Sequence, residues 1–232
     1  MRGLVAFCAL AGCGRIEFSD VTDARPDAVP PGFCATATFS NPPASSLHDD
    51  FSVDPFTDRW SPVNPMMPCI VQTGGELVAT PDSQGLFCHA YTIGDVHLTC
   101  DAITVRVPEV TSPAELGIQT FMYAYVPAVD TSVAVIVEGG GLQIGVIGKT
   151  GEQLAGSVFD PTQDRWWRLR EHDGELAFDA AVDGIAWREL MRAPTPLSLD
   201  HVTIALGAGT YKPVGPPGQA RFRCYNVPPP CN

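Results

Sequence analysis

The chain has 232 residues, 45% of them hydrophobic and only 17% charged, and its formal net charge at pH 7 is −12. A surface of that sign repels phosphate backbones, so the composition argues against nucleic acid as a partner. The 22 glycines and 22 prolines favour short strands and many turns over long helices, and the length suits one large sandwich or barrel. We therefore expect an all-β protein.

The first residues indicate export. Arg2 is followed by a short apolar run, Leu4 to Leu10, and by small residues before Cys13, which is the order of a signal peptide. The run is far shorter than the ~20 residues that cross a bilayer. Residues 10–13 resemble the bacterial lipoprotein signal, in which cleavage before the cysteine leaves it carrying lipid. We expect a signal peptide over 1–12 and lipidation of Cys13, with an ordinary signal peptide as the alternative.

A tether follows the predicted anchor. Residues 13–32 are polar, rich in aspartate and end in prolines, a composition typical of a flexible linker. Gly14 after the cysteine, instead of aspartate, resembles a signal for sorting to the outer membrane. We expect a cell-envelope location, as an outer-membrane lipoprotein that faces the periplasm or the cell surface. The membrane is then a partner through the lipid anchor. A single domain is expected over residues 33–232.

The remaining cysteines indicate three disulfides. Without Cys8 and Cys13 their number is even, and cysteines of exported proteins are normally oxidised to disulfides. The six are Cys34, Cys69, Cys88, Cys100, Cys224 and Cys231. We expect Cys88 to pair with Cys100, because a hairpin loop centred on Gly94 would place them opposite each other. Cys34 is expected to join Cys224 or Cys231 as a clasp between the ends of the domain.

The same predicted hairpin offers a second interpretation, a metal site made of Cys88, His89, His97 and Cys100. The spacing matches no common zinc pattern. Adjacent strand residues such as Cys88 and His89 also point to opposite faces. We therefore expect the disulfide, no metal and no cofactor.

Alternation of apolar and polar residues between turn signals predicts about a dozen short strands. In chain order they are 47–51, 76–79, 86–91, 98–107, 118–126, 133–137, 142–147, 154–159, 166–171, 176–181, 186–190, 202–206 and 220–225. Strands of such even spacing predict a two-sheet antiparallel sandwich.

The turn at Asp173 and Gly174 sets the register of one hairpin. An Asp-Gly pair between alternating strands predicts a two-residue type I′ turn. The predicted pairs are His172 with Glu175, Glu171 with Leu176, Leu169 with Phe178, Arg168 with Asp179 and Trp167 with Ala180. This register sets apolar against apolar and positive against negative side chains. A second turn at Asp183 and Gly184 is expected to set Arg188 beside Asp179, giving a charge ladder of Arg168, Asp179 and Arg188.

The acids of this hairpin, Glu171, Asp173 and Glu175, have a spacing like that of the acid/base strand of many jelly-roll glucanases. A glycosidase needs two carboxyls that converge on one bond, about 5 to 9.5 Å apart. In the predicted register Glu171 and Glu175 point to opposite faces of the sheet. We therefore expect no catalytic site here.

The segments "RWWRLRE" and "FDAAVDGIAWREL", joined through the Asp-Gly turn, resemble exported bacterial domains of the concanavalin A-like lectin/glucanase superfamily, of the laminin-G-like and DUF1349 types. "HDDFSVDPFTDRW" is similar to their opening strand and loop, and "GGELVATP" to the next strand. The resemblance covers about residues 33–231 and implies a jelly roll, a fold that hosts lectins, glucanases and adhesion modules. Asp49, Asp50 and Asp54 are a candidate calcium set, with a solvated strand end as the alternative.

Two surfaces are candidates for ligand binding. Phe121, Tyr123 and Tyr125 share one face of their strand and form either a stacking platform for sugar rings or part of the core. The second candidate is a polar face made of Trp166, Arg168 and Arg170, for which a salt-bridged outer surface is the alternative. No arrangement of catalytic nucleophile and base is legible.

These observations predict a lipid-anchored, non-catalytic binding module, with a carbohydrate or another envelope component as its ligand, and hence not an enzyme. The first alternative is a glycoside hydrolase or lyase whose carboxylates only the fold brings together. The second is a purely structural or adhesive surface protein.

Overall fold

The structure is a computed structural model that describes residues 32–53, 56, 59–62, 69–147 and 151–231. The predicted signal peptide, Cys13 and the linker up to residue 31 lie outside the described residues. The division into 1–12, 13–32 and 33–232 therefore stays a prediction. In the described part, no helix is both long enough and apolar enough to span a membrane.

The strands form two antiparallel sheets of seven, which confirms the predicted all-β sandwich. The first sheet has the order β1 (Trp60–Pro62), β4 (Phe87–Thr92), β13 (Thr203–Thr210), β6 (Ile118–Val126), β7 (Thr131–Glu138), β8 (Gly141–Ile147) and β9 (Glu152–Val158). The second has the order β12 (Arg188–Pro194), β11 (Glu175–Ala181), β10 (Trp166–His172), β5 (Ala102–Glu109), β14 (Ala220–Arg223), β3 (Glu76–Ala79) and β2 (Ile70–Thr73). Three short 3₁₀ helices complete the described elements: η1 (Phe33–Ala35), η2 (Ala44–Ser46) and η3 (Pro127–Val129).

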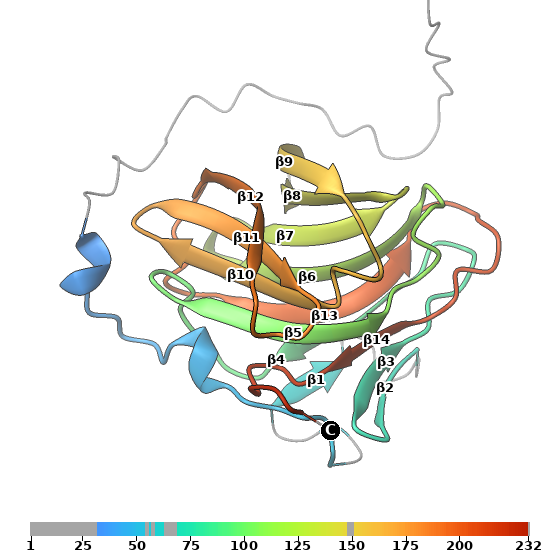
Figure 1. Ribbon diagram of the computed structural model, residues 1–232, viewed down its shortest axis with the longest axis horizontal. Coiled ribbons are helices and arrows are strands. Elements are labelled where there is room, and N and C mark those ends of the chain that lie inside the picture. Colours follow the sequence, from blue (N-terminus) through green and yellow to red (C-terminus); the bar gives the residue numbers. More distant parts are fainter. Residues whose placement is uncertain (1–31, 54–55, 57–58, 63–68, 148–150, 232) are drawn as a thin grey trace, which may run out of the picture.

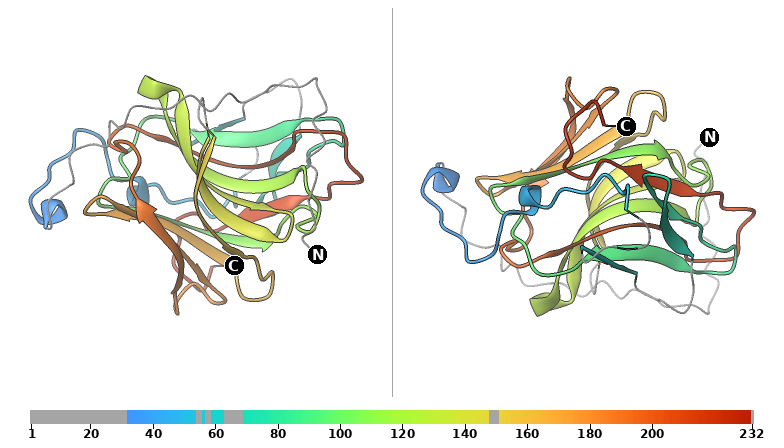
Figure 2. Two further views of the ribbon diagram at one scale, coloured as in Figure 1. Left: turned by 90° about the horizontal axis from the view of Figure 1, so that it is seen from above. Right: turned by 90° about the horizontal axis from the view of Figure 1, so that it is seen from below.

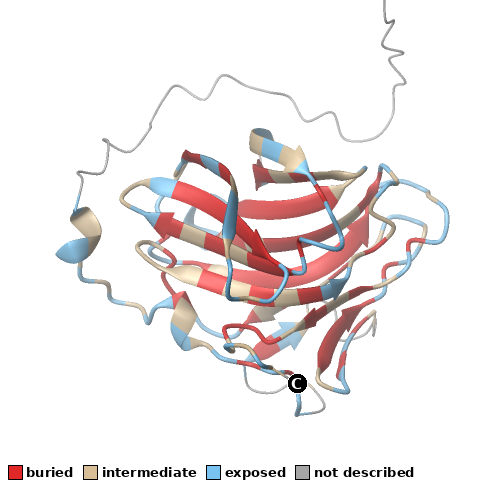
Figure 3. Cartoon of the chain, viewed as in Figure 1, coloured by how far each residue is buried: buried red, intermediate tan, exposed pale blue. Residues whose placement is uncertain are grey.

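The core lies between the two sheets, which face each other in the views of Figures 1 and 2. Alternate residues of each strand point inward, so that Met122 and Val135 of the first sheet join Val105 and Phe178 of the second in one buried cluster. Trp167 is fully buried there, and its indole N–H donates to the carbonyl oxygen of Asp164 at 2.9 Å. Figure 3 shows both sheets largely buried, with exposed residues collected in the loops and on the edge strands β9 and β12.

The predicted strands are mostly present, with two differences. Residues 47–51 form no strand, and only an isolated bridge joins Asp49 to Tyr225. The strand predicted over 98–107 begins at Ala102, because residues 93–101 carry the chain from the first sheet to the second. The short strands β1 and β2 were not predicted.

The hairpin β10–β11 has the predicted register, including His172 opposite Glu175 and Arg168 opposite Asp179. Both turn residues, Asp173 and Gly174, have positive φ angles of 50° and 80°, as a type I′ turn requires.

The register of the next pair, β11–β12, differs from the prediction by one residue. The connection between the strands is one residue longer than predicted, so Arg188 lies opposite Ala180 and Glu189 opposite Asp179. A bulge between Phe178 and Asp179 then shifts the register again, to Phe178 opposite Met191. The predicted ladder is therefore wrong at its third member. Arg188 instead forms an ion pair with Asp164 at 2.7 Å.

Three disulfides are present, but the predicted pairings are wrong. Cys88 does not pair with Cys100, because β4 and β5 belong to different sheets and form no hairpin. The pairs are Cys34–Cys100, Cys69–Cys88 and Cys224–Cys231. The expected clasp between Cys34 and Cys224 or Cys231 is also wrong. Cys34 pairs with Cys100, and the last two cysteines pair with each other and close a local loop.

Candidate functional site

The acids of the hairpin bind backbone N–H groups and one neighbouring arginine. Glu171 is 3% exposed, and its two carboxylate oxygens accept hydrogen bonds from the backbone N–H groups of Cys100 at 2.6 Å and Gly174 at 2.7 Å. Asp173 accepts from the N–H groups of Gly32 and Cys34 at 2.9 and 3.0 Å. Each carboxylate is therefore occupied in holding backbone, and the acids do not converge.

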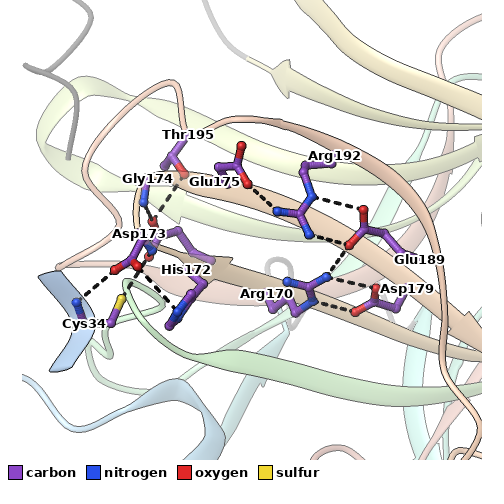
Figure 4. Close-up of polar contacts among 11 residues, drawn as sticks. Cys34, Arg170, His172, Asp173, Gly174, Glu175, Asp179, Glu189, Arg192 and Thr195 are labelled. Atoms are coloured by element: carbon purple, nitrogen blue, oxygen red, sulfur yellow. Dashed lines mark hydrogen bonds and ion pairs between the residues drawn. The ribbon is translucent and has the colours of Figure 1, made fainter. Parts of the chain in front are cut away.

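Figure 4 shows how the hairpin acids are used. Asp173 points to the segment of Cys34, and these backbone hydrogen bonds lower the pKa of Asp173. Glu175 points away from it, to an ion pair with Arg192. The carboxyl groups of Glu171 and Asp173 also lie near the sulfur of Cys34, but that sulfur is in a disulfide and is not available to a metal.

The predicted polar face of Trp166, Arg168 and Arg170 lies on the outer face of the second sheet. Arg168 and Arg170 both donate to Asp179, at 2.7 and 2.8 Å, and the guanidinium of Arg168 lies 4.5 Å from the ring centre of Trp187. Trp166 is only 5% exposed. The charges and the indole of this face are thus engaged within the sheet, in agreement with the alternative interpretation of a salt-bridged surface.

The other predicted surface, Phe121, Tyr123 and Tyr125, lies on the outer face of the first sheet, away from the main core. Phe121 packs in a small separate cluster with Ala134 and Ile136, whereas Met122 of the same strand joins the main core. Phe121 is buried in this second cluster, and Tyr123 and Tyr125 are half-buried, so the stripe lies outside the main core but is partly buried on its own face.

A second strand brings three more rings to the same face. We define the aromatic platform as Phe87, His89 and Tyr91 of β4 together with Phe121, Tyr123 and Tyr125 of β6. The ring centroids of neighbouring members lie 4.8 to 6.4 Å apart. Phe87 is 40% exposed, which leaves one ring open to solvent at the edge of the platform.

The strand between them, β13, presents almost no side chains to this face. Gly207 lies opposite both His89 and Phe121 in the strand register. A Cβ atom on Gly207 would lie 2.4 Å from the carbonyl oxygen of Cys88 and from Cβ of His89, and a Cβ atom on Gly209 would lie 2.2 Å from the ring of Phe87. These glycines let the rings of β4 and β6 meet above β13.

His89 is the unusual member of the platform. Both ring nitrogens are buried and have no hydrogen-bond partner among the described residues. Rings of Tyr91, Phe121 and Tyr123 lie edge-on to its imidazole at 4.8 to 5.9 Å. Burial lowers the pKa of His89 to about 4, so the imidazole is neutral at pH 7.

A shallow hollow of about 650 Å³ continues the same face at β8 and β9. Its polar lining comes from Glu138, Gln143, Gln153, Ser157 and Tyr211. The carboxylate of Glu138 accepts hydrogen bonds from the N–H of Gly117 at 2.7 Å, from the amide of Gln119 at 2.9 Å and from the hydroxyl of Tyr211. Burial, followed by this bond, raises the pKa of Tyr211 to about 12.

The platform and the hollow belong to one continuous surface. The strand register sets Phe121 opposite Ile136, Ile136 opposite Gln143 and Gln143 opposite Gly156. A row perpendicular to the strands therefore leads from the rings of β4 and β6 to the hollow.

Sequence reasoning found half of this surface. The residues Phe87, His89 and Tyr91 alternate along β4 as Phe121, Tyr123 and Tyr125 do along β6, so their pattern was visible. Their pairing across β13 was not, because β4, β13 and β6 are far apart in the chain. The residues of the hollow carry no sequence motif.

Two members of the candidate calcium set, Asp49 and Asp50, lie among the described residues. Oδ1 of Asp49 accepts from the N–H of Phe51 at 2.7 Å, and Oδ1 of Asp50 from the N–H of Ser52 at 3.0 Å. The side chain of Ser52, followed by its backbone N–H, lowers the pKa of Asp50. Asp54 lies outside the described residues.

No family model matches the chain, and no curated protein matches its sequence. Solved structures match its fold. The Bacillus licheniformis β-glucanase is 11% identical, with 77% of this chain and 95% of that chain covered and a TM-score of 0.56. A structure described as a native glycosidic hydrolase is 15% identical, with 82% and 96% covered and a TM-score of 0.60. Porphyranase B from Zobellia galactanivorans is 8% identical, with 79% and 92% covered and a TM-score of 0.54.

These matches correct the expectation that the chain is not an enzyme, because the three proteins are named as enzymes: a β-glucanase, a glycosidic hydrolase and a porphyranase. Identities this low establish the fold and leave the reaction to be tested. The described chain has the concanavalin A-like jelly-roll fold that the sequence resemblance implied.

Proposed function

We propose that the protein acts on a polysaccharide that binds across the outer face of the first sheet. The observation that carries the proposal is the aromatic platform, a set of rings from β4 and β6 on the outer face of the first sheet. Phe87 is its exposed member, Phe121 is buried, and the other four rings are half-buried. Rings on an outer face offer flat apolar surfaces on which the faces of sugar rings stack, and tyrosine hydroxyls add polar contacts.

The hollow beside the platform supports the same proposal. Gln143 and Gln153 supply neutral donors and acceptors, which suit sugar hydroxyl groups. Gly156 has no side chain, and the amide of Gln153 lies over it, 2.6 Å from where a Cβ atom would be. A chain of several sugar units that crosses the strands would contact the platform and the hollow together.

Hydrolysis of the bound chain is the reaction we propose. It is favoured by the names of the proteins with matching folds and by Glu138, the described carboxylate that lines the hollow. Glycosidases use one carboxyl as general acid and another as nucleophile or base. Three donors fix the orientation of Glu138, which suits it for one of these roles. Glu115, next to Leu116 in the lining, is the nearest acid along the chain for the other role.

The location follows from the cysteines. Three disulfides are typical of an oxidising, extracytoplasmic compartment. We propose in addition that Cys13 carries a lipid anchor on the outer membrane. Labelling of expressing cells with an alkyne-bearing fatty acid tests the anchor: the label is expected on the wild-type chain, and its retention in Cys13→Ser would contradict the proposal.

The binding proposal is tested with polysaccharide gels and with a reducing-sugar assay on the same substrates. We expect at least one polysaccharide to retard the protein, and Phe87→Ala to weaken retention about 5- to 20-fold, equivalent to about 1 to 2 kcal/mol of lost stacking. Ile185→Ala is the matched control, since Ile185 is 72% exposed in the turn between β11 and β12, on the second sheet. Equal retention of wild type and Phe87→Ala would place the ligand elsewhere.

Hydrolysis is tested separately. We expect new reducing ends from the retained polysaccharide and a loss of at least 100-fold in Glu138→Gln, with binding preserved. A rate unchanged in Glu138→Gln would remove Glu138 from the reaction.

A further inference from the structure

We infer that the polysaccharide is uncharged, an inference that rests on the proposed function of the outer face of the first sheet. The first observation is the distribution of basic side chains. The strands of the first sheet, as the structure describes them, contain neither lysine nor arginine. The strands of the second sheet contain one arginine on β5 and two on each of β10, β12 and β14.

An anionic sugar needs a cation where it binds. A carboxylate or sulfate that loses water without a paired positive charge carries a large desolvation penalty, and arginine is the usual partner because it donates two parallel hydrogen bonds. His89 does not take this role, because its buried imidazole is neutral at pH 7. The aromatic platform therefore offers no charge partner for an acidic sugar.

Among the described residues, Lys212 is the lysine near this surface. It follows β13, and its side-chain carbons lie against Gly117, where a Cβ atom would be 2.3 Å from Cε. The carboxylate of Glu138 accepts a hydrogen bond from the N–H of Gly117, and that of Glu115 accepts one from the N–H of Gly215. Two acids near one lysine leave this end of the surface net negative, which repels an anionic chain.

What the surface does offer matches hydroxyl groups. The amides of Gln143 and Gln153 donate and accept without charge. On the second sheet, six of the seven arginines of the described strands are in ion pairs, among them Arg170 and Arg192 with Glu189 and Arg223 with Glu76, which disfavours that sheet as the site of an anionic chain. The net charge of −12 adds a general repulsion of polyanions.

The test is affinity electrophoresis of the full-length protein in gels that contain matched polysaccharides. The neutral members are hydroxyethylcellulose, β-1,3-glucan, mixed-linkage β-glucan, xylan and agarose, and each is run beside a carboxymethylated or sulfated form of the same backbone. We expect retardation by at least one neutral member, unchanged between 0.02 and 0.3 M salt, and at least tenfold weaker retardation by its anionic form. An anionic form that binds as tightly as its neutral parent would overturn the inference and leave the proposed function standing. Retardation by no member would overturn the proposed function, and this inference with it.

A charge-introducing variant tests the cause. Gln153→Lys places a cation in the hollow. At 0.02 M salt, we expect it to reduce the ratio of retardation by the neutral form to retardation by the anionic form at least threefold. Thr73→Lys is the matched control, because Thr73 is exposed on the second sheet and the added charge is the same. If Gln153→Lys leaves this ratio unchanged, or if Thr73→Lys reduces it equally, the absence of a local cation is not the reason why the surface prefers a neutral polysaccharide.

Discussion

The hydroxyl of Tyr123 donates a hydrogen bond to the hydroxyl of Tyr91 at 2.8 Å, across the strand β13 that separates them. Burial, followed by this bond, raises the pKa of Tyr123, so its phenol stays protonated over the physiological range. The bond fixes two rings of the aromatic platform relative to each other before any ligand arrives. A platform fixed in this way loses less conformational entropy when a sugar chain binds.

A double-mutant cycle on Tyr91→Phe and Tyr123→Phe tests this relationship. We expect a coupling energy of about 0.5 to 1.5 kcal/mol in the free energy of unfolding, the usual range for one internal hydrogen bond. Urea unfolding followed by fluorescence provides the measurement. The matched control pairs Tyr91→Phe with Tyr211→Phe, since Tyr211 bonds to Glu138 and not to Tyr91. Additive effects of the first pair would mean that the two hydroxyls do not stabilise the platform.

His89 predicts a pH dependence of stability. Its folded pKa of about 4 lies below the unfolded value of 6.5, so the unfolded chain binds more protons between these values and stability falls as the pH is lowered. The described titratable groups packed against it are the phenols of Tyr91 and Tyr123, and burial raises the pKa of Tyr123. We expect the free energy of unfolding of the wild type to drop by about 2 kcal/mol from pH 6.5 to pH 4.5.

In His89→Leu, the free energy of unfolding is expected to fall much less between pH 6.5 and pH 4.5. This variant is also expected to be at least as stable as wild type at pH 7, because an apolar group replaces a buried imidazole that has no hydrogen-bond partner among the described residues. His201→Gln is the control, since the side chain of His201 is 58% exposed. A wild-type slope that persists in His89→Leu would show that other groups cause it.

Glu171 predicts a large loss of stability that has nothing to do with catalysis. In Glu171→Ala the backbone N–H groups of Cys100 and Gly174 lose their acceptor in a buried place, which is expected to cost about 2 to 4 kcal/mol. Glu175→Ala removes an acid of the same hairpin that is half exposed and paired with Arg192, at an expected cost below about 1 kcal/mol. Chemical unfolding measures both. The reverse order of the two losses would contradict the structural role of Glu171, and loss of glycan cleavage in a folded Glu171→Gln protein would return it to the list of catalytic candidates.

The parts of the fold that local chemistry decides were predictable. The register of β10 and β11 follows from the Asp173–Gly174 turn and from the matching of charged and apolar positions on either side of it. The alternation on β6 likewise showed which residues share a face. It could not show which face is outside, because that depends on the two strands that pair with β6. One of them, β7, follows β6 directly, but the other, β13, is distant in the chain.

The parts that depend on the crossing of the chain between sheets were not predictable. Cys88 and Cys100 lie close in sequence, but residues 93–101 leave the first sheet and enter the second, so Cys88 meets Cys69 while Cys100 meets Cys34. The Asp183–Gly184 pair also did not show that the connection between β11 and β12 is one residue longer than a two-residue turn, which places Arg188 opposite Ala180. The hollow unites residues of several strands and loops, and no local pattern brings Glu138 and Tyr211 together.

The disulfides give a last prediction that separates the pairing found in the structure from the pairing expected from the sequence. Peptide mapping of the unreduced protein is expected to recover Cys34 linked to Cys100 and Cys69 linked to Cys88. A peptide linking Cys88 to Cys100 would contradict the structure. The stability of paired serine variants provides a second readout. Cross-linking stabilises a protein mainly by restricting the unfolded chain, and more so for longer loops. The Cys34–Cys100 bond closes a separation of 66 residues and the Cys224–Cys231 bond one of 7.

We therefore expect the double variant Cys34→Ser/Cys100→Ser to lose about 4 kcal/mol and Cys224→Ser/Cys231→Ser about 2 kcal/mol. The first pair also positions the segment whose N–H groups Asp173 holds, so its loss is expected to release that segment and to make the backbone near Cys34 sensitive to protease. Equal losses for the two variants would mean that loop length is not what decides their stabilisation.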